Sequence, residues 1–269
     1  MLSSTSLSNI QALIIDMDGV LWRGDTALPG LSDFFAFLRA NNIPFTLATN
    51  NARKTPDQYV QRFAGLGIEI FPKEVMTSSL ATAEYLKTQY PPETRMYVVG
   101  EDGIHQALTD AGFVISEENV AAVVAGIDFE LTYNKLKIAT LHINKGARFI
   151  GTNPDLTFPF EDGFAPGAGS ILAAISAATG KQPAIIGKPE STMFEVALQR
   201  MKTDPARTAM IGDRLETDIL GAQRAGLKTI LVLSGIAQPE DLKNSDIKPD
   251  WVFRGIDELK KNWNADSLS

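Results

Sequence analysis

Two aspartates, Asp16 and Asp18, stand directly after an apolar run in the segment ALIIDMDG, which extends from Ala12 to Gly19. Residues two positions apart in an extended segment project to the same side, so the two carboxylates share a face. Gly19 then allows the backbone to turn or to approach a ligand closely. Two close carboxylates both stay ionised only beside a cation; otherwise one of them holds a proton. The pair alone is also compatible with a simple Asp-Gly turn. Whether it belongs to a reaction centre depends on the residues that follow the other apolar runs.

Polar side chains also follow three further apolar runs, at the points where those runs end. In open parallel sheets, ligands bind outside the carboxyl ends of the strands. We therefore expect these side chains to form one site with the acid pair. They are Thr49, Asn50 and Asn51 after the second run, Lys188 after the third, and Asp213 with Asp218 after the fourth.

The chemistry of this set is that of phosphoryl transfer. An acidic cluster without histidine or cysteine suits Mg²⁺, which prefers oxygen ligands and shares its shell with phosphate. Lys188 supplies a point charge for phosphate, and Thr49 and Asn50 supply neutral hydrogen-bond donors. The chain has no cysteine and only two histidines, both in helix-like stretches. Asp16 is therefore the best available nucleophile, with Asp18 as the general acid and later the base.

Strands that alternate with helices must position these groups. The predicted strands are short, apolar and rich in β-branched residues, and the segments between them have helical spacing. This alternation predicts an α/β fold with a doubly wound, Rossmann-like parallel sheet. The predicted strands are Ala12–Ile15, Pro44–Ala48, Met96–Val99, Ala121–Ala125, Ala147–Ile150, Ala184–Ile186, Thr208–Ile211, Lys228–Leu233 and Trp251–Phe253. The predicted helices are Leu31–Asn42, Thr55–Ala64, Ser78–Lys87, Asn134–Lys145, Gly169–Thr179, Ser191–Met201, Glu216–Ala225 and Asp257–Trp263.

The four polar strand ends come from the two ends of the chain. The middle has its own α/β pattern but contributes no similarly placed acid pair. We therefore expect a discontinuous catalytic core, residues 1–79 and 183–269, with a smaller α/β cap domain, residues 80–182, inserted between its two parts. Such a domain could close over the site of the core.

Composition excludes several classes of protein. The chain has 269 residues, of which 44% are hydrophobic, and a formal net charge of −7. The negative charge disfavours a nucleic acid polymer as partner. The absence of cysteine excludes disulfides, thiolate nucleophiles and cysteine-ligated metals. No secretory signal and no apolar run long enough for a membrane span are present, so a cytoplasmic location is the default expectation.

Three further features have more than one interpretation. Trp22 either stacks on a substrate or anchors the loop after the acid pair. The stretch Thr152–Gly167, with Asp155, is either a cap loop that faces the site or an ordinary long surface connection. Asp218 either supports the site or favours the first turn of its helix through the macrodipole.

The motifs DMDGV, TNN, GKP and GDRLETD, in this order, resemble the four motifs of the haloacid dehalogenase-like phosphatases. Longer stretches, including TNNARKTPDQY, GARFIGTNPD and GDRLETDILGAQRAG, resemble the branch of para-nitrophenyl phosphatases and phosphoglycolate phosphatases. That branch also includes nucleotide and pyridoxal phosphate phosphatases. The resemblance covers nearly the whole chain and implies a Mg²⁺-dependent phosphatase of small phosphate monoesters, with a homodimer through the cap as a further possibility.

The resemblance also implies a role for each motif residue. Asp16 is the phospho-accepting nucleophile and a metal ligand, and Asp18 is the acid/base that also ligates the metal through its backbone carbonyl. The phosphoryl oxygens are held by the TNN motif and by Lys188. Asp213 is the third protein ligand of the metal, and Asp218 supports it.

Two other functions remain open from the residues. A phosphotransferase or mutase on the same core would move the phosphoryl group to another sugar hydroxyl, and product analysis separates it from a phosphatase. A phospho-aspartate signalling protein would carry similar residues without turnover, but receivers of that class are about half this length and lack an inserted domain.

Overall fold

The computed structural model describes residues 6–160 and 163–266. No helix among the described residues is long and apolar enough to cross a membrane. The chain divides into two compact units. The first comprises the described residues of Met1–Thr49, Asp57–Met76 and Pro189–Ser269, and the second comprises Asn50–Pro56 and the described residues of Thr77–Lys188.

The first unit is built on a six-stranded sheet with the order β15-β14-β13-β1-β4-β5. Four of its strand pairs are parallel: β14 with β15, β13 with β14, β1 with β13, and β1 with β4. Every residue of β1 is buried, as expected for a strand covered on both faces. The strands are β1 (Ala12–Ile15), β4 (Phe45–Thr49), β5 (Val75–Thr77), β13 (Thr208–Gly212), β14 (Lys228–Val232) and β15 (Trp251–Phe253).

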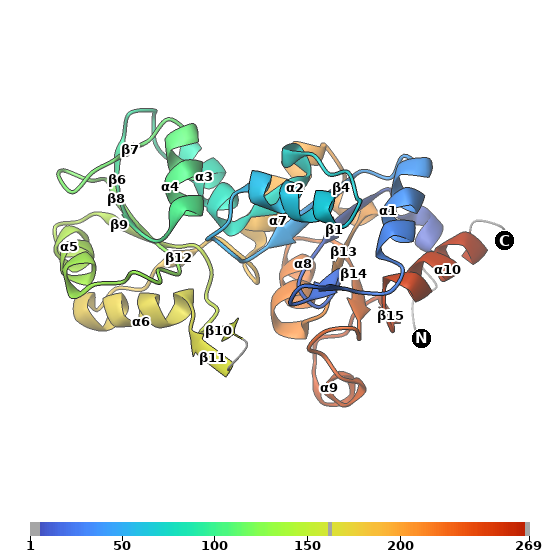
Figure 1. Cartoon of the computed structure of the whole chain (residues 1–269). Coiled ribbons are helices and arrows are strands. Elements are labelled where there is room, and N and C mark those ends of the chain that lie inside the picture. The colour runs from blue at the N-terminus through green and yellow to red at the C-terminus, as the bar shows by residue number, and fades with distance from the viewer. Residues whose placement is uncertain (1–5, 161–162, 267–269) are drawn as a thin grey trace. The chain divides into compact units, whose positions relative to one another are not determined.

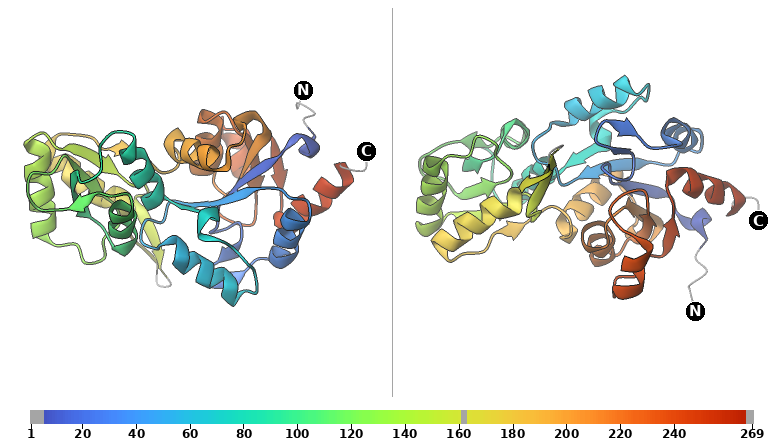
Figure 2. Two further views of the ribbon diagram at one scale, coloured as in Figure 1. Left: turned by 90° about the horizontal axis from the view of Figure 1, so that it is seen from above. Right: turned by 60° about the horizontal axis from the view of Figure 1, so that its bottom comes forward.

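Helices cover both faces of this sheet. On one face, a core that contains Phe34 and Phe63 packs α1, α2 and α10 against the strands. Helices α7 and α8 lie on the opposite face (Figure 2). A small hairpin, β2 (Trp22–Arg23) with β3 (Thr26–Ala27), follows the first strand. The helices are α1 (Leu31–Ala40), α2 (Pro56–Gly65), α7 (Ser191–Met201), α8 (Leu220–Arg224), α9 (Pro239–Asn244) and α10 (Ile256–Asp266).

The second unit has its own five-stranded parallel sheet with the order β12-β9-β8-β6-β7. Helices α5 and α6 pack on one face, and α3 and α4 lie on the other (Figure 1). The strands are β6 (Arg95–Val99), β7 (Val114–Ile115), β8 (Ala122–Ala125), β9 (Arg148–Gly151) and β12 (Ala184–Ile185). The helices are α3 (Ser78–Lys87), α4 (Asp102–Asp110), α5 (Tyr133–Asn144) and α6 (Ala168–Thr179).

The predicted α/β class with parallel sheets is confirmed, and most predicted elements lie within two residues of the observed ones. Helices α4 and α9 and strands β2, β3, β5 and β7 are absent from the prediction. The stretch Thr152–Gly167 is not a simple connection, because it forms the antiparallel hairpin of β10 (Thr157–Phe160) and β11 (Gly163–Pro166). The helix predicted over Glu216–Ala225 begins as a π-helical turn at Leu215–Ile219 before α8.

Candidate functional site

Asp16 is the first residue after β1, and the sheet fixes its backbone. Its N–H donates to the carbonyl of Ile211 in β13 at 2.8 Å, which extends the parallel ladder by one residue. The side chain is only 9% exposed. The rigid strand therefore holds the Asp16 carboxylate at the carboxyl end of the sheet, where the sequence analysis placed it.

Asp213 follows β13, the strand next to β1, and its carboxylate is enclosed by backbone. The N–H of Ile236 donates to its Oδ2 at 2.8 Å. A Cβ added at Gly19 would lie 2.3 Å from this Oδ2, and one added at Gly235 would lie 1.9 Å from it. Gly19 also has φ +83°, in the left-handed region. Only glycine meets both demands at position 19, which explains the glycine after the acid pair.

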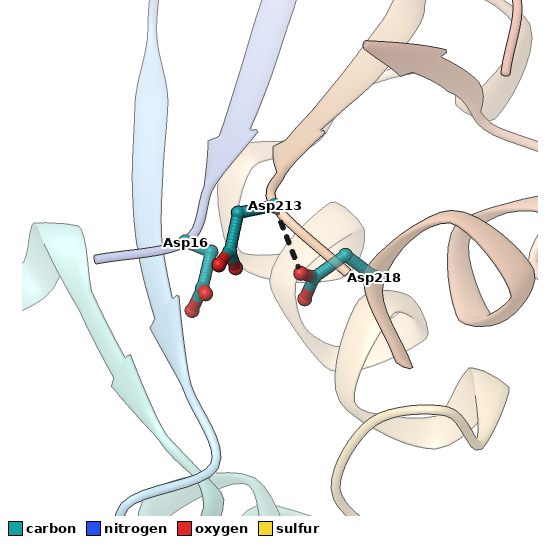
Figure 3. A group of neighbouring side chains, drawn as sticks. All are labelled: Asp16, Asp213 and Asp218. Carbon is teal, nitrogen blue, oxygen red and sulfur yellow. Dashed lines mark hydrogen bonds between the residues drawn. The ribbon is translucent and has the colours of Figure 1, made fainter. Parts of the chain in front are cut away.

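Asp218 supports the loop that carries Asp213. Its Oδ2 accepts hydrogen bonds from the backbone N–H of Asp213 at 3.2 Å and of Arg214 at 3.1 Å. Asp218 is fully buried and belongs to the π-helical turn after β13. Figure 3 shows the bond to the Asp213 backbone and the three acidic side chains directed toward one another. Asp218 therefore supports the site through hydrogen bonds of its side chain. Its position in the first turn of the helix is not its only contribution.

The carboxylates of Asp16, Asp213 and Asp218 each have an oxygen within 4.8 Å of the others. Three buried like charges at this separation raise one another's energy unless a cation is present. Hard carboxylate oxygens without nitrogen or sulfur ligands suit Mg²⁺ or a similar divalent cation. The side chain of Asp18 is not part of this group, and the metal ligand predicted at this position is its backbone carbonyl, not its carboxylate.

The side chain of Asp18 is exposed, and Trp22 holds it. The indole Nε1–H of Trp22 donates to Asp18 Oδ1 at 2.9 Å, and the N–H of Gly19 donates to the carbonyl of Trp22 at 2.8 Å. Trp22 is fully buried and packs edge-to-face on Phe63, with ring centroids 5.0 Å apart. Of the two interpretations of Trp22, the structure favours the loop anchor, since a buried indole offers no face to a substrate.

Thr49, the last residue of β4, is 4% exposed and is hydrogen-bonded to the phenol of Tyr59 in α2. Burial raises the pKa of Tyr59, and the charges of Asp18 and Asp16 raise it further. The phenol therefore stays protonated and neutral beside the acids. Sequence reasoning missed Tyr59, and its only signal is a position on the apolar side of the predicted helix Thr55–Ala64.

The remaining predicted residues, Asn50, Asn51 and Lys188, lie in the second unit as the contacts divide the chain. Asn51 Oδ1 accepts from the backbone N–H of Arg53 at 3.0 Å. The side-chain oxygen of Asn50 accepts from the backbone N–H of Lys188, and its NH₂ donates to the backbone carbonyl of Lys188 and to the carboxylate of Asp155. The side chain of Asn50 could therefore contact a phosphate only by giving up these bonds.

The chain is similar to known proteins over nearly its whole length. A family model described as haloacid dehalogenase-like hydrolase matches residues 13–114, and one described as HAD-hydrolase-like matches residues 185–259. An acid sugar phosphatase from Staphylococcus haemolyticus is 40% identical over 261 residues, which cover 95% of this chain and 99% of that protein.

Solved structures give the same result. The 4-nitrophenylphosphatase from Thermotoga maritima is similar with a TM-score of 0.90 and 38% identity, over 95% of this chain and 98% of that chain. A p-nitrophenyl phosphatase from Archaeoglobus fulgidus has a TM-score of 0.89 and 28% identity, over 94% of this chain and 98% of that chain. The similarity therefore includes both units.

Proposed function

Because this chain belongs to the haloacid dehalogenase-like hydrolases, we propose that it hydrolyses small phosphate monoesters through an aspartyl-phosphate on Asp16. One observation carries the proposal. The buried Asp16 carboxylate, held by the end of β1, lies with Asp213 and Asp218 in a single acidic cluster. Names of relatives such as acid sugar phosphatase and 4-nitrophenylphosphatase support the same class of reaction.

We propose Mg²⁺ as the cation of this cluster, with Asp16 and Asp213 as side-chain ligands and the backbone carbonyl of Asp18 as a third. Asp218 holds the loop of Asp213 in place through its two backbone hydrogen bonds. When bound, the metal offsets the negative charge of the carboxylates and of the phosphoryl group, so that an anionic nucleophile and an anionic substrate can meet.

Asp16 and Asp18 divide the chemistry between them. A carboxylate oxygen of Asp16 forms a bond to phosphorus while the bond from phosphorus to the ester oxygen breaks. Asp18 in its protonated form gives its proton to the departing oxygen, which leaves as an alcohol. Asp18, now a carboxylate, takes a proton from water as that water attacks the aspartyl-phosphate. Inorganic phosphate is released, and both aspartates return to their starting states.

The phosphoryl oxygens are bound by hydrogen-bond donors and by one cation in this proposal. Thr49 supplies a hydroxyl whose position is fixed by Tyr59. Lys188 supplies positive charge, and Asn51 completes the set. We propose that the second unit is the cap of this family, whose surface selects the leaving group, and that it also forms the contact of a homodimer. Sugar phosphates and aryl phosphates are the first substrates to test, given the relatives' names.

The test is steady-state hydrolysis of para-nitrophenyl phosphate and a panel of metabolite phosphates with Mg²⁺, read as kcat/KM. Asp16→Asn should abolish phosphate release, whereas the exposed Asp33→Asn in α1 serves as the matched control. Asp18→Asn should impair turnover and leave substrate binding largely intact. Full activity of Asp16→Asn would contradict the nucleophile assignment. A stable phosphoprotein without turnover would instead indicate a signalling protein, and transfer to a sugar hydroxyl would indicate a phosphotransferase.

A further inference from the structure

We propose that Asn50 is a positioning residue that fixes the backbone of Lys188, with Asp155 orienting the Asn50 amide. The inference rests on the proposed function, in which Lys188 binds the phosphoryl group. It gives Asn50 a different task from the direct phosphate contact that the motif pattern predicts.

The contact between Asn50 and Lys188 has two points. Asn50 Oδ1 accepts from the backbone N–H of Lys188 at 2.9 Å, and Asn50 Nδ2 donates to the backbone carbonyl of Lys188 at 2.9 Å. The side-chain amide thus pairs with the N–H and the carbonyl of a single residue, as a neighbouring strand would. Because the two bonds lie on either side of the Lys188 Cα atom, they fix the direction in which its side chain leaves the backbone.

Asp155 determines which way the Asn50 amide faces. Its Oδ2 accepts the remaining Nδ2 hydrogen of Asn50 at 3.2 Å. The reversed amide would direct its oxygen at the Lys188 carbonyl and the Asp155 carboxylate, and its NH₂ at the Lys188 N–H. Each of these three contacts would then be repulsive. The backbone of Asp155 is itself held in a local turn, since its N–H donates to Asn153 Oδ1 at 3.1 Å.

The backbone of Asn50 is anchored as firmly as its side chain. Its carbonyl accepts from Ser78 Oγ at 2.7 Å and from Asn153 Nδ2 at 2.8 Å. Glycine at position 187 leaves room for this arrangement, because an added Cβ would lie 2.6 Å from Asn50 Oδ1. Residue 50 therefore ties Lys188 to the start of α3 and to the turn after β9.

Asn50→Asp is the sharpest test because it keeps the shape of the side chain and replaces the NH₂ donor by an acceptor. It places an oxygen against the Lys188 carbonyl and the Asp155 carboxylate. We expect kcat/KM for para-nitrophenyl phosphate to fall roughly 10- to 100-fold, as for a catalytic group displaced by about an ångström. The inhibition constant of inorganic phosphate should rise, since a displaced Lys188 binds the anion less well.

The matched control is Asn41→Asp. Asn41 lies at the end of α1, and its Nδ2 donates to the carbonyl of Phe37 at 2.8 Å. The substitution makes the same atomic change and removes one amide-to-carbonyl hydrogen bond away from the acid cluster. We expect its activity and phosphate inhibition to stay within about twofold of the wild type.

A double-mutant cycle with Lys188→Met separates positioning from a direct contact. If Asn50 acts through Lys188, then Asn50→Asp should add less than about a twofold loss in the Lys188→Met background. An equal loss in both backgrounds, or an unchanged phosphate inhibition constant, would overturn the inference. Should Asn50→Asp fail to fold, Asn50→Ala removes all three side-chain hydrogen bonds without adding charge, and the same cycle applies.

Failure of the proposed function is recognised separately. A wild-type chain that hydrolyses no phosphate ester would contradict the proposed function. The inference could still be tested by calorimetric titration of inorganic phosphate into the wild type, Asn50→Asp and Asn41→Asp, which requires no turnover. Equal phosphate affinity of all three chains would overturn it.

Discussion

Replacing Trp22 by phenylalanine isolates the hydrogen bond that holds the proposed acid/base. The indole Nε1–H donates to Asp18 Oδ1 at 2.9 Å. The ring itself is enclosed, with Phe63 at its edge and the guanidinium of Arg62 4.0 Å from its centroid. Phenylalanine keeps the six-membered ring in this packing but has no donor. The change therefore releases the Asp18 carboxylate while leaving the fold of the loop in place.

The magnitude follows from the protonation and the exposure of Asp18. In the proton-donating step Asp18 is a neutral acid, and a hydrogen bond between neutral groups contributes about 0.5–1.5 kcal/mol. Because Asp18 is exposed and water competes for its carboxyl group, about 1 kcal/mol applies. That figure corresponds to an approximately fivefold lower population of the productive arrangement, and hence to an approximately fivefold lower kcat where proton donation limits the rate. The smaller ring should also lower the free energy of unfolding by about 1–2 kcal/mol.

The assay is a series of phosphate monoesters whose leaving alcohols differ in pKa. A poor leaving group needs the proton of Asp18 most, so Trp22→Phe should steepen the fall of log kcat with leaving-group pKa. Trp263→Phe is the matched control. Trp263 in α10 is also buried and packs edge-to-face on Phe37, with ring centroids 6.0 Å apart. An equal loss of kcat for good and poor leaving groups, or the same change of slope in Trp263→Phe, would refute the reasoning.

Three further substitutions test other parts of the arrangement. Asp218→Ala removes the acceptor of two backbone hydrogen bonds, and we expect the Mg²⁺ concentration for half-maximal activity to rise about 10- to 100-fold, measured by metal titration. Gly19→Ala should lower Tm and metal affinity together, because its Cβ would meet Asp213 Oδ2 at 2.3 Å; Gly24→Ala shares the positive φ without a neighbour within 4 Å and should leave metal affinity unchanged. Burial, with smaller effects of nearby carboxylates, raises the pKa of Tyr97 to about 12. The phenol of Tyr97 therefore keeps its proton in the folded chain at pH values where it has lost it in the unfolded chain, whose tyrosine titrates near pH 10. The contribution of this phenol to the free energy of unfolding is complete below about pH 10 and disappears as the pH rises through about 12. Tyr97→Phe should flatten the decline between these pH values in urea unfolding, and an unchanged decline would contradict the assignment.

The sequence was sufficient for the strands and for the acids at their ends. Buried strands of a parallel sheet are short runs of apolar residues, so β1 and β13 are visible as ALII and TAMIG. The residue after such a run is placed by the ladder itself, as the hydrogen bond from Asp16 to Ile211 shows. Asp16 and Asp213 could be predicted to approach each other because their positions depend mainly on this local rule.

The supporting contacts could not be predicted, because each joins residues whose sequence separation carries no periodic signal. The Asn50 amide meets Lys188 138 positions later and Asp155 105 positions later. The hydrogen bond of Tyr59 to Thr49 depends on how α2 packs on the sheet. The start of the helix after Asp213 as a π turn depends on Asp218 bonding back to the loop. These features are set by packing, which the pattern of one sequence does not encode.

The residues at the strand ends and the residues that support them have different tasks in the site. Most of the groups proposed to do chemistry are first placed by the backbone at a strand end, but their final orientation comes from a side chain elsewhere: Trp22 for Asp18, Tyr59 for Thr49, and Asn50 for Lys188. Each of these partners supplies or accepts a hydrogen bond in a buried or partly buried place, where a lost partner is not fully replaced by water. Replacing any of these three partners should therefore lower activity through the alignment on which turnover depends, even in a chain that keeps all four motifs.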